Sequence, residues 1–429
     1  MKHTLFCIGK KHWLFLLVAF VSIQTACKKD NGSSGAAPVI TSIATVDPLN
    51  RDSTFTQALP GTLIHIAGSG FDGILHIYIN NMDVTFNSAL GSNTSLIVTI
   101  PLNVPSPALD PTLPNQIKVV TTHGEATYNF TIIAPPPIIA NVYNENAPAG
   151  STLIIAGMNF YDISDVVFPG GISGTNIVTS DSGRLLTVTV PSGITTADTL
   201  HITGKYGTGA SPTLFNTAGA PSMGFLADFN NGSPYFGWAY WNGTQTNQGF
   251  PGNTGQFIQM NPVKELPIGP GNYVWYNNNG RGVMVNAGQW IASSAQDNVN
   301  NYAVKFELSV DPNTPWTLGE LYIVTAVPKS EYTARYAPWE TAPNGKFFTN
   351  GWMTVTIPLT SFIQGNYSYV PNPKPPAQAP KPPSTIADLT TSSYNQAIAI
   401  VLMNEGAVGD PAITAFNVAV DNVRIVKIK

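Results

Sequence analysis

The last 210 or so residues of the chain are poor in the side chains that most enzymes use for catalysis. All six histidines and both cysteines lie before residue 202. Residues 220–429 therefore contain no Ser-His-Asp triad, no Cys-His pair and none of the usual zinc sites. Glycoside hydrolysis needs only two carboxylates, and the candidates are Asp228, Glu265, Asp297, Glu307, Glu320, Glu331, Glu340 and Asp421. None of them stands in a recognisable acid/base motif, so we expect no catalytic residues here.

Three of these carboxylates have a simpler structural interpretation. Glu307 and Glu320 lie within strand-like segments, where a solvated sheet face accounts for them. Asp421, in "VDNV", is typical of a structural position and could lie beside a calcium ion. No EF-hand-like loop is present. We therefore expect no metal site and no cofactor, with a structural calcium ion as the alternative.

The tryptophans are unevenly distributed along the chain. Of the eight, Trp13 is near the N-terminus and the other seven all follow residue 222. An indole ring matches the flat, apolar C–H face of a pyranose, and its π cloud attracts the slightly positive hydrogens. Asparagine, glutamine, arginine and aspartate can hydrogen-bond the sugar's rim hydroxyls. Aromatic residues beside asparagines in loops are therefore the pattern expected of a surface that stacks on sugars.

The stretch "GNYVWYNNNG" (271–280) fits this pattern, because three asparagines and a glycine end the strand just after Trp275 and Tyr276. In "GWAYWNGTQ", Trp238 and Trp241 cannot share a face of one strand, and Trp241 precedes Asn242 and Gly243. Trp339 lies in a proline-flanked loop near Arg335. Trp352 begins an alternating strand and is interpreted as core. The predicted stacking set is Trp275, Tyr276, Trp241 and Trp339 with Arg335, plus Trp290 and Trp316, for which core and surface both remain open.

The elements that must position these residues are strands. "NYAVKFELSV" (301–310) alternates apolar and polar residues, and "GELYIVTAV", "GWMTVTIPLTSF", "AIAIVLMN" and "FNVAVDNVRIVKI" are further strand-like runs. Some 200 residues of long strands without helix suit a jelly-roll β-sandwich. Earlier in the chain, "ALPGTLIHIAGSGF" (58–71) matches "APAGSTLIIAGMNF" (147–160), a repeat of domain size rather than of solenoid size.

The repeats resemble the IPT/TIG domain, through "PG", the strand ending in "G.GF" or "G.NF", and the later "VTIP" (98–101) and "VTVP" (188–191). This resemblance implies immunoglobulin-like sandwiches at residues 38–134 and 135–219. Residues 220–429 are similar to galactose-binding-like carbohydrate-binding β-sandwiches, through "LADFNNG", "GWMTVTIPLTSF" and "VAVDNVRIV". The predicted fold is therefore all-β, with two Ig-like domains followed by a larger jelly-roll.

The N-terminus has the features of an export signal. Lys2, Lys10 and Lys11 precede the apolar run "WLFLLVAFVSI", which is too short to span a bilayer comfortably. "QTAC" then resembles a bacterial lipobox, although Gln24 stands where an aliphatic residue is usual. The resemblance implies a signal peptide at residues 1–26, lipidation of Cys27 and a polar tether at residues 27–37. The alternative is an ordinary secretory signal.

This domain order resembles the cell-surface glycan-binding lipoproteins of Bacteroidetes. The resemblance implies a non-catalytic protein on the outer membrane, facing outward, that captures a β-glucan, xyloglucan or mannan. Its implied partners are a TonB-dependent transporter and the glycan-binding lipoprotein associated with it. A glycan hydrolase or lyase and a structural adhesin are the alternatives. A net charge of −4 without a basic run gives no indication of nucleic-acid binding.

Overall fold

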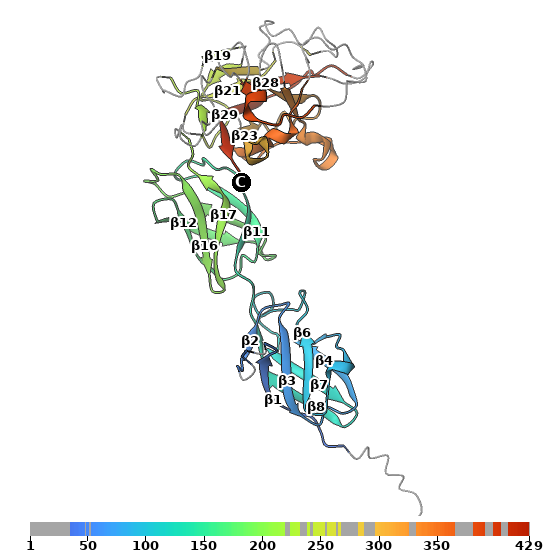
Figure 1. Ribbon diagram of the computed structural model, residues 1–429. Helices are drawn as coiled ribbons and strands as arrows, with labels where there is room; N and C mark the ends of the chain where they lie inside the picture. The colour runs from blue at the N-terminus through green and yellow to red at the C-terminus, as the bar shows by residue number, and fades with distance from the viewer. Residues whose placement is uncertain are drawn as a thin grey trace, which may run out of the picture. The chain divides into compact units, whose positions relative to one another are not determined.

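The structure is a computed structural model (Figure 1). It describes residues 35–47, 49–50, 53–218, 224–231, 238–240, 243–253, 255–262, 265–266, 282–286, 297–325, 332–364, 381–390, 398–404 and 411–428. The chain forms two compact units, one ending at Ala134 and the other beginning at Pro135. The predicted signal peptide, Cys27 and most of the tether lie outside the described residues. Among the described helices, none is both long and apolar enough to cross a membrane.

The first unit is a small β-sandwich, which we call sandwich 1. One sheet has the order β1-β3-β6 and the other β5-β4-β7-β8, and β2 pairs with β9 in parallel. Its elements are β1 (Val39–Thr45), β2 (Gln57–Ala58), β3 (Leu63–Ser69), β4 (Ile74–Ile79), β5 (Met82–Asp83), the 3-10 helix η1 (Ser88–Leu90), β6 (Ser95–Thr99), β7 (Gln116–Thr121), β8 (Gly124–Asn129) and β9 (Thr131–Ile132).

Sandwich 2 opens the second unit and repeats this plan. Its sheets have the orders β10-β11-β15-β14 and β13-β12-β16-β17. The strands are β10 (Ile138–Val142), β11 (Thr152–Met158), β12 (Ile163–Phe168), β13 (Ile172–Ser173), β14 (Thr175–Thr179), β15 (Leu185–Thr189), β16 (Asp198–Gly204) and β17 (Gly207–Phe215).

The repeated glycine and phenylalanine of the sequence motif have the same role in both sandwiches. A Cβ atom at Gly68 would collide with the Val39 carbonyl and the Phe71 ring, and one at Gly157 would collide with the Ile138 carbonyl and the Phe160 ring. Both phenylalanines are buried. Only glycine lets the neighbouring strand and the ring approach so closely, which is why the motif keeps this spacing.

In the residues that the structure describes, sandwich 3, the larger one, has two six-stranded antiparallel sheets (Figure 1). One sheet has the order β20-β21-β29-β23-β26, with β18 also paired to β29, and the other has the order β19-β22-β28-β24-β25-β27. The strands are β18 (Phe225–Ala227), β19 (Trp238–Tyr240), β20 (Thr244–Thr246), β21 (Phe257–Met260), β22 (Gly282–Asn286), β23 (Tyr302–Val310), β24 (Glu320–Thr325), β25 (Tyr332–Tyr336), β26 (Met353–Pro358), β27 (Ile363–Gln364), β28 (Ile398–Met403) and β29 (Val418–Lys427).

Helical structure in the described part of sandwich 3 is confined to short segments between strands. They are η4 (Val299–Asn301), η5 (Pro338–Glu340), η6 (Pro343–Gly345), η7 (Leu359–Ser361) and α2 (Ile386–Thr390). The core between the two sheets is filled by the inward residues of the long strands, among them Val304, Phe306 and Leu308 of β23. The predicted fold class, all-β with two smaller sandwiches followed by a larger one, is confirmed.

Sandwich 2 contacts sandwich 3 through the turn that follows β10. The backbone N–H of Thr354 in β26 donates to the carbonyl of Tyr143 at 2.6 Å. The backbone N–H of Glu145 donates to Oγ1 of Thr354 at 2.9 Å. The turn, residues 143–146, therefore lies against the outer face of the sheet that contains β26.

Candidate functional site

Four of the predicted sugar-stacking residues lie outside the described residues. They are Trp241, Trp275, Tyr276 and Trp290. The described part of their neighbourhood is β19, which ends at Tyr240, and β22, which begins at Gly282. These two strands pair with each other, Tyr240 opposite Met284. Trp241 therefore follows one strand of this pair, and Trp275 and Tyr276 precede the other, and all four residues stay predictions.

Trp316 belongs to the core, so its inclusion in the stacking set is wrong. The residue is 1% exposed. Its indole N–H donates to the carbonyls of Leu318 and Gly319, both at 3.1 Å. A tryptophan is fully buried at low cost only where its N–H has a partner, and here it has two. Its ring meets three others edge-on, with centroid distances of 5.2 Å to Phe416, 6.0 Å to Tyr336 and 6.4 Å to Phe347.

Trp352 is also buried, as predicted. It forms a small cluster with Phe250, Phe257 and Ala419 that is separate from the main core. Its indole N–H donates to the carbonyl of Phe250 at 3.3 Å. The cluster covers part of the outer face of the sheet that contains β26 and β29.

Trp339 lies on η5 and is half-buried. Its indole N–H donates to the Gly319 carbonyl at 2.6 Å, the same carbonyl that Trp316 uses. The ring packs against the main core from outside. Because the N–H and one side of the residue are fixed, the remaining exposed part of the ring has a defined orientation, which a stacking surface requires.

Arg335, at the end of β25, is held in place by two carboxylates. Nη1 and Nη2 donate to the two oxygens of Glu340 at 2.9 and 2.6 Å, and Nη2 also donates to Glu320 at 3.3 Å. The Arg335 hydrogen bond lowers the pKa of Glu340, and the Glu340 hydrogen bond raises the pKa of Arg335. Arg335 and Glu340 are each 44% exposed. They form a fixed polar pair in the segment of Trp339, with donors and acceptors suited to hydroxyl groups.

The sequence analysis missed one exposed aromatic residue in the same segment. Phe348 follows Phe347, whose backbone pairs with that of Trp316, and the Phe348 side chain is 56% exposed. Neighbouring residues on an extended segment point to opposite faces, so a pair of phenylalanines that begins with a core residue could have indicated it. We call Trp339, Arg335, Glu340 and Phe348 the Trp339 segment.

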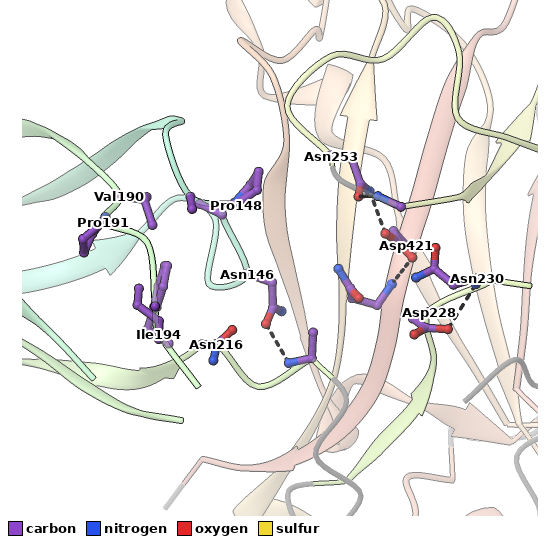
Figure 2. Close-up of a pocket in the computed structure, with 17 residues that line it drawn as sticks. Asn146, Pro148, Val190, Pro191, Ile194, Asn216, Asp228, Asn230, Asn253 and Asp421 are labelled. Atoms are coloured by element: carbon purple, nitrogen blue, oxygen red, sulfur yellow. Dashed lines mark hydrogen bonds between the residues drawn. The ribbon is translucent and has the colours of Figure 1, made fainter. Parts of the chain in front are cut away.

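A polar pocket of about 310 Å³ lies between sandwiches 2 and 3 (Figure 2). Pro148, Val190, Pro191 and Ile194 line it on the sandwich 2 side, and Asp228, Asn230, Asn253 and Asp421 line it on the other. Its amides are used in holding loops. Asn146 accepts from the backbone N–H of Ala218 at 2.8 Å, and Asn230 accepts from that of Gln256 at 2.7 Å. These two amides thus fix loops that line the pocket, each on its own side.

Asp421 is the most deeply buried acid of this pocket, at 2% exposure. Its carboxyl accepts from Nδ2 of Asn253 at 2.6 Å and from the backbone N–H of Asn422 at 2.8 Å. Burial raises the pKa of Asp421 well above its ordinary value, against these two hydrogen bonds, and the charges of Glu307 and Asp228 add to the increase. Across the described residues, no group of three or more His, Cys, Asp or Glu side chains is arranged so that it could hold a metal ion. The calcium alternative stays a prediction.

Replacing Asp421 by asparagine is expected to stabilise the protein at pH 8. An acid with a raised pKa keeps its proton in the folded state after the unfolded chain has lost it, so stability falls as pH rises above 3.8 towards the folded-state pKa. The substituted amide does not ionise, so the variant avoids this loss. We expect a Tm increase of a few degrees at pH 8 in EDTA, which shrinks at pH 4, measured by scanning calorimetry.

Asp311→Asn is the matched control of opposite sign. Backbone and side-chain hydrogen bonds lower the pKa of Asp311, so this variant should lose stability at pH 8. An unchanged or lower Tm of Asp421→Asn in EDTA would contradict the prediction. A fall of the wild-type Tm on adding EDTA would instead support the structural calcium ion.

Four of the candidate carboxylates are held by partners in the structure. Glu307 is bound by Arg424, and Glu320 and Glu340 are bound by Arg335. Asp297 accepts from the hydroxyl of Tyr302 at 2.5 Å. The solvated face predicted for Glu307 and Glu320 is wrong, because they are only 2% and 4% exposed. Their arginine partners come from other strands, which the local pattern does not show.

Comparison with known proteins connects this architecture to a family. Residues 221–427 match the family model described as the surface glycan-binding protein B xyloglucan binding domain. An IPT/TIG domain-containing protein of Bacteroides ovatus is 34% identical over 164 residues, which are 38% of this chain and 32% of that protein. The match thus spans about a third of the length of this curated relative.

Two solved structures are similar over most of the chain. The surface glycan-binding protein PbSGBP-B from Prevotella bryantii is 20% identical, with a TM-score of 0.61, covering 92% of this chain and 99% of that one. SGBP-B from a complex xyloglucan utilization locus in Bacteroides uniformis is 19% identical, with a TM-score of 0.48, covering 91% and 99%. At such identities the likeness to PbSGBP-B is one of fold. Residues 221–427 are thus similar to the surface glycan-binding protein B xyloglucan binding domain.

Proposed function

We propose that sandwich 3 binds a β-linked plant-type glucan, with xyloglucan as the first candidate, and that the chain does not cleave it. The observation that carries the proposal is the match of residues 221–427 to a xyloglucan-binding domain family. The fold shared with PbSGBP-B supports it. A β-1,4-linked backbone is flat on both faces, so it suits a row of aromatic rings.

The binding surface proposed here is formed by Trp275, Tyr276, Trp241 and Trp290. Each stacked ring contributes on the order of 1–2 kcal/mol, and three rings give micromolar to millimolar affinity after the entropic costs of binding. The Trp339 segment is a second part of the proposed surface. Its half-buried indole and its fixed Arg335–Glu340 pair supply the two kinds of contact that a sugar needs, an apolar face and paired donors and acceptors.

The other parts of the chain are proposed to hold this surface away from a membrane. Lipidated Cys27 would anchor the chain to the outer membrane, with the binding domain facing outward. Sandwiches 1 and 2 would act as spacers, joined by a proline-rich segment that ends where β10 begins. A TonB-dependent transporter and its associated glycan-binding lipoprotein would receive the captured chain.

Native gel electrophoresis with embedded polysaccharides tests the proposal directly. Residues 28–429 should be retarded by xyloglucan and not by dextran, whose α-linked chain does not offer the same flat faces. Parallel gels with mixed-linkage glucan and galactomannan show which of these β-glycans the protein binds most tightly. A reducing-sugar assay on the same mixtures should stay at background. Release of reducing ends would contradict the non-catalytic role, and absence of retardation on every β-glycan would contradict glycan binding.

A further inference from the structure

The outer face of one sheet in sandwich 3 carries charged side chains that are almost completely buried. Lys305 and Glu307 of β23 are 3% and 2% exposed, and Arg424 of β29 is 0% exposed. Lys305 lies opposite Arg424 in the β23–β29 pairing, so two cations are neighbours on this face. Burying charge is costly unless it is paired, and Glu307 alone cannot balance both.

The missing negative charge comes from sandwich 2. Glu145, in the turn after β10, accepts from Nζ of Lys305 at 2.5 Å through Oε1 and from Nη2 of Arg424 at 3.0 Å through Oε2. Glu307 accepts from Nη1 and Nη2 of Arg424 at 2.7 and 2.9 Å. The two cations and two carboxylates sum to zero net charge. We call Glu145, Lys305, Glu307 and Arg424 the ion cluster.

The pKa shifts of Glu145 and Arg424 agree with this pairing, whereas burial outweighs the Glu145 charge at Lys305 and lowers the pKa of Lys305. Burial pushes the pKa of Glu145 upward, yet the charges of Arg424 and Lys305 outweigh it and the pKa lies below its ordinary value. For Arg424, burial acts in the opposite direction, and Glu307 and Glu145 together raise the pKa. Glu145 and Arg424 thus stabilise each other's charged form across the boundary between the sandwiches.

The turn that presents Glu145 is fixed on both sides. On the sandwich 2 side, the backbone N–H of Asn216 donates to the Glu145 carbonyl at 2.7 Å, and Asn146 is held by Ala218. On the sandwich 3 side, Thr354 binds the backbone at Tyr143 and Glu145, and Nδ2 of Asn146 donates to Glu307 at 3.2 Å. The contact between sandwiches 2 and 3 at this turn therefore combines backbone hydrogen bonds, side-chain hydrogen bonds and ion pairs.

We propose that Glu145 is a positioning residue that fixes sandwich 3 in one orientation on sandwich 2. The working unit of the protein is then residues 135–429, because the family-matched segment 221–427 lacks the carboxylate that its own Lys305 and Arg424 require. In addition to acting as a spacer, sandwich 2 is then part of the glycan-presenting body. This consequence for glycan presentation rests on the proposed function, whereas the ion cluster itself does not.

The first test replaces Glu145 by glutamine in the chain 28–429, which keeps the side-chain shape and removes the charge. Breaking a buried ion pair by removing one partner is strongly destabilising. We expect the Tm of the transition that includes sandwich 3 to fall by about 10 °C. Glu125→Gln on sandwich 1 is the matched control, because it removes a carboxylate from the exposed Lys118–Glu125 pair at 3.6 Å and should leave the Tm within about 1 °C.

The second measurement reads orientation rather than stability. Residues 28–429 contain no cysteine, so Val178→Cys and Lys346→Cys, both exposed positions on sandwiches 2 and 3, can carry a pair of spin labels. Pulsed electron–electron double resonance should give one narrow distance distribution for this labelled parent and a broad one when Glu145→Gln is added. A purely local loss of stability would leave the distribution of the folded molecules narrow.

A double variant keeps the proposal falsifiable if Glu145→Gln fails to fold. Adding Lys305→Met removes the unpaired cation and leaves Arg424 and Glu307 as a bonded, balanced pair, so at least half of the lost Tm, or folding itself, should return. A distance distribution that stays narrow in Glu145→Gln would overturn the proposal whether or not the Tm falls, and so would a double variant that is no more stable than the single one. Neither the Tm nor the distance distribution depends on glycan. The role of Glu145 can therefore be contradicted while xyloglucan still retards the protein, and glycan binding can be contradicted while the role of Glu145 holds.

Discussion

Trp275→Ala and Trp241→Ala are each expected to abolish measurable retardation by the cognate β-glucan while the protein stays folded. Each ring contributes on the order of 1–2 kcal/mol, so its loss weakens binding about 5- to 30-fold. From a starting affinity at the millimolar end of the expected range, that takes binding below the range of a gel. Isothermal titration with the purified polysaccharide measures the residual affinity, and circular dichroism checks the fold.

Tyr206→Ala, an aromatic truncation on sandwich 2, is the control and should leave affinity unchanged. Retained affinity in both tryptophan variants would overturn the site assignment, although not glycan binding itself. The Trp339 segment would then be the next surface to test, beginning with Trp339→Ala.

Trp316→Ala is expected to produce the largest loss of stability among the tryptophan variants. The residue is 1% exposed and its indole N–H has two carbonyl partners. Truncation leaves a large cavity next to Phe416 and Tyr336 and removes both hydrogen bonds. Such a change costs about 3–5 kcal/mol, and urea unfolding followed by circular dichroism measures it.

Trp339→Ala provides the comparison, because the two indoles share the Gly319 carbonyl but differ in burial. We expect it to cost less than half as much stability and to lower glycan affinity instead. Equal stability losses in the two variants would contradict the division between a core and a surface tryptophan.

Alternation along single strands was the part of the fold that could be predicted from sequence. "NYAVKFELSV" predicts one apolar face, and Tyr302, Val304, Phe306 and Leu308 all lie in the core. The doubled Gly and Phe motif likewise indicated two equivalent small sandwiches. Strand alternation and the Gly-to-Phe spacing both involve residues close in sequence, so a single sequence displays both patterns directly.

The failures come from partners that are distant in sequence. Lys305 and Glu307 occupy the polar face of the same strand, and the pattern alone predicts that this face is solvated. It is buried because Glu145 reaches it from a position 160 residues earlier. Trp316 similarly depends on rings at positions 336, 347 and 416. Nothing in "NTPWTLG" itself distinguishes a core tryptophan from an exposed one.

The position of β29 has a consequence for the synthesis of the protein. This strand lies inside its sheet, between β21 and β23, and also pairs with β18, yet it is made last of all these strands. At about 5–20 residues per second, roughly 10–40 s separate β18 from β29 on the ribosome. During that interval β18, β21 and β23 lack their shared neighbour and present unpaired strand edges. Glu145 also lacks one of its ion-pair partners during this interval, because Arg424 is part of β29. The synthesis of sandwich 3 is therefore the stage of biosynthesis at which the chain is prone to aggregate. A nascent chain that stops short of residue 418 cannot complete the sheet that contains β29.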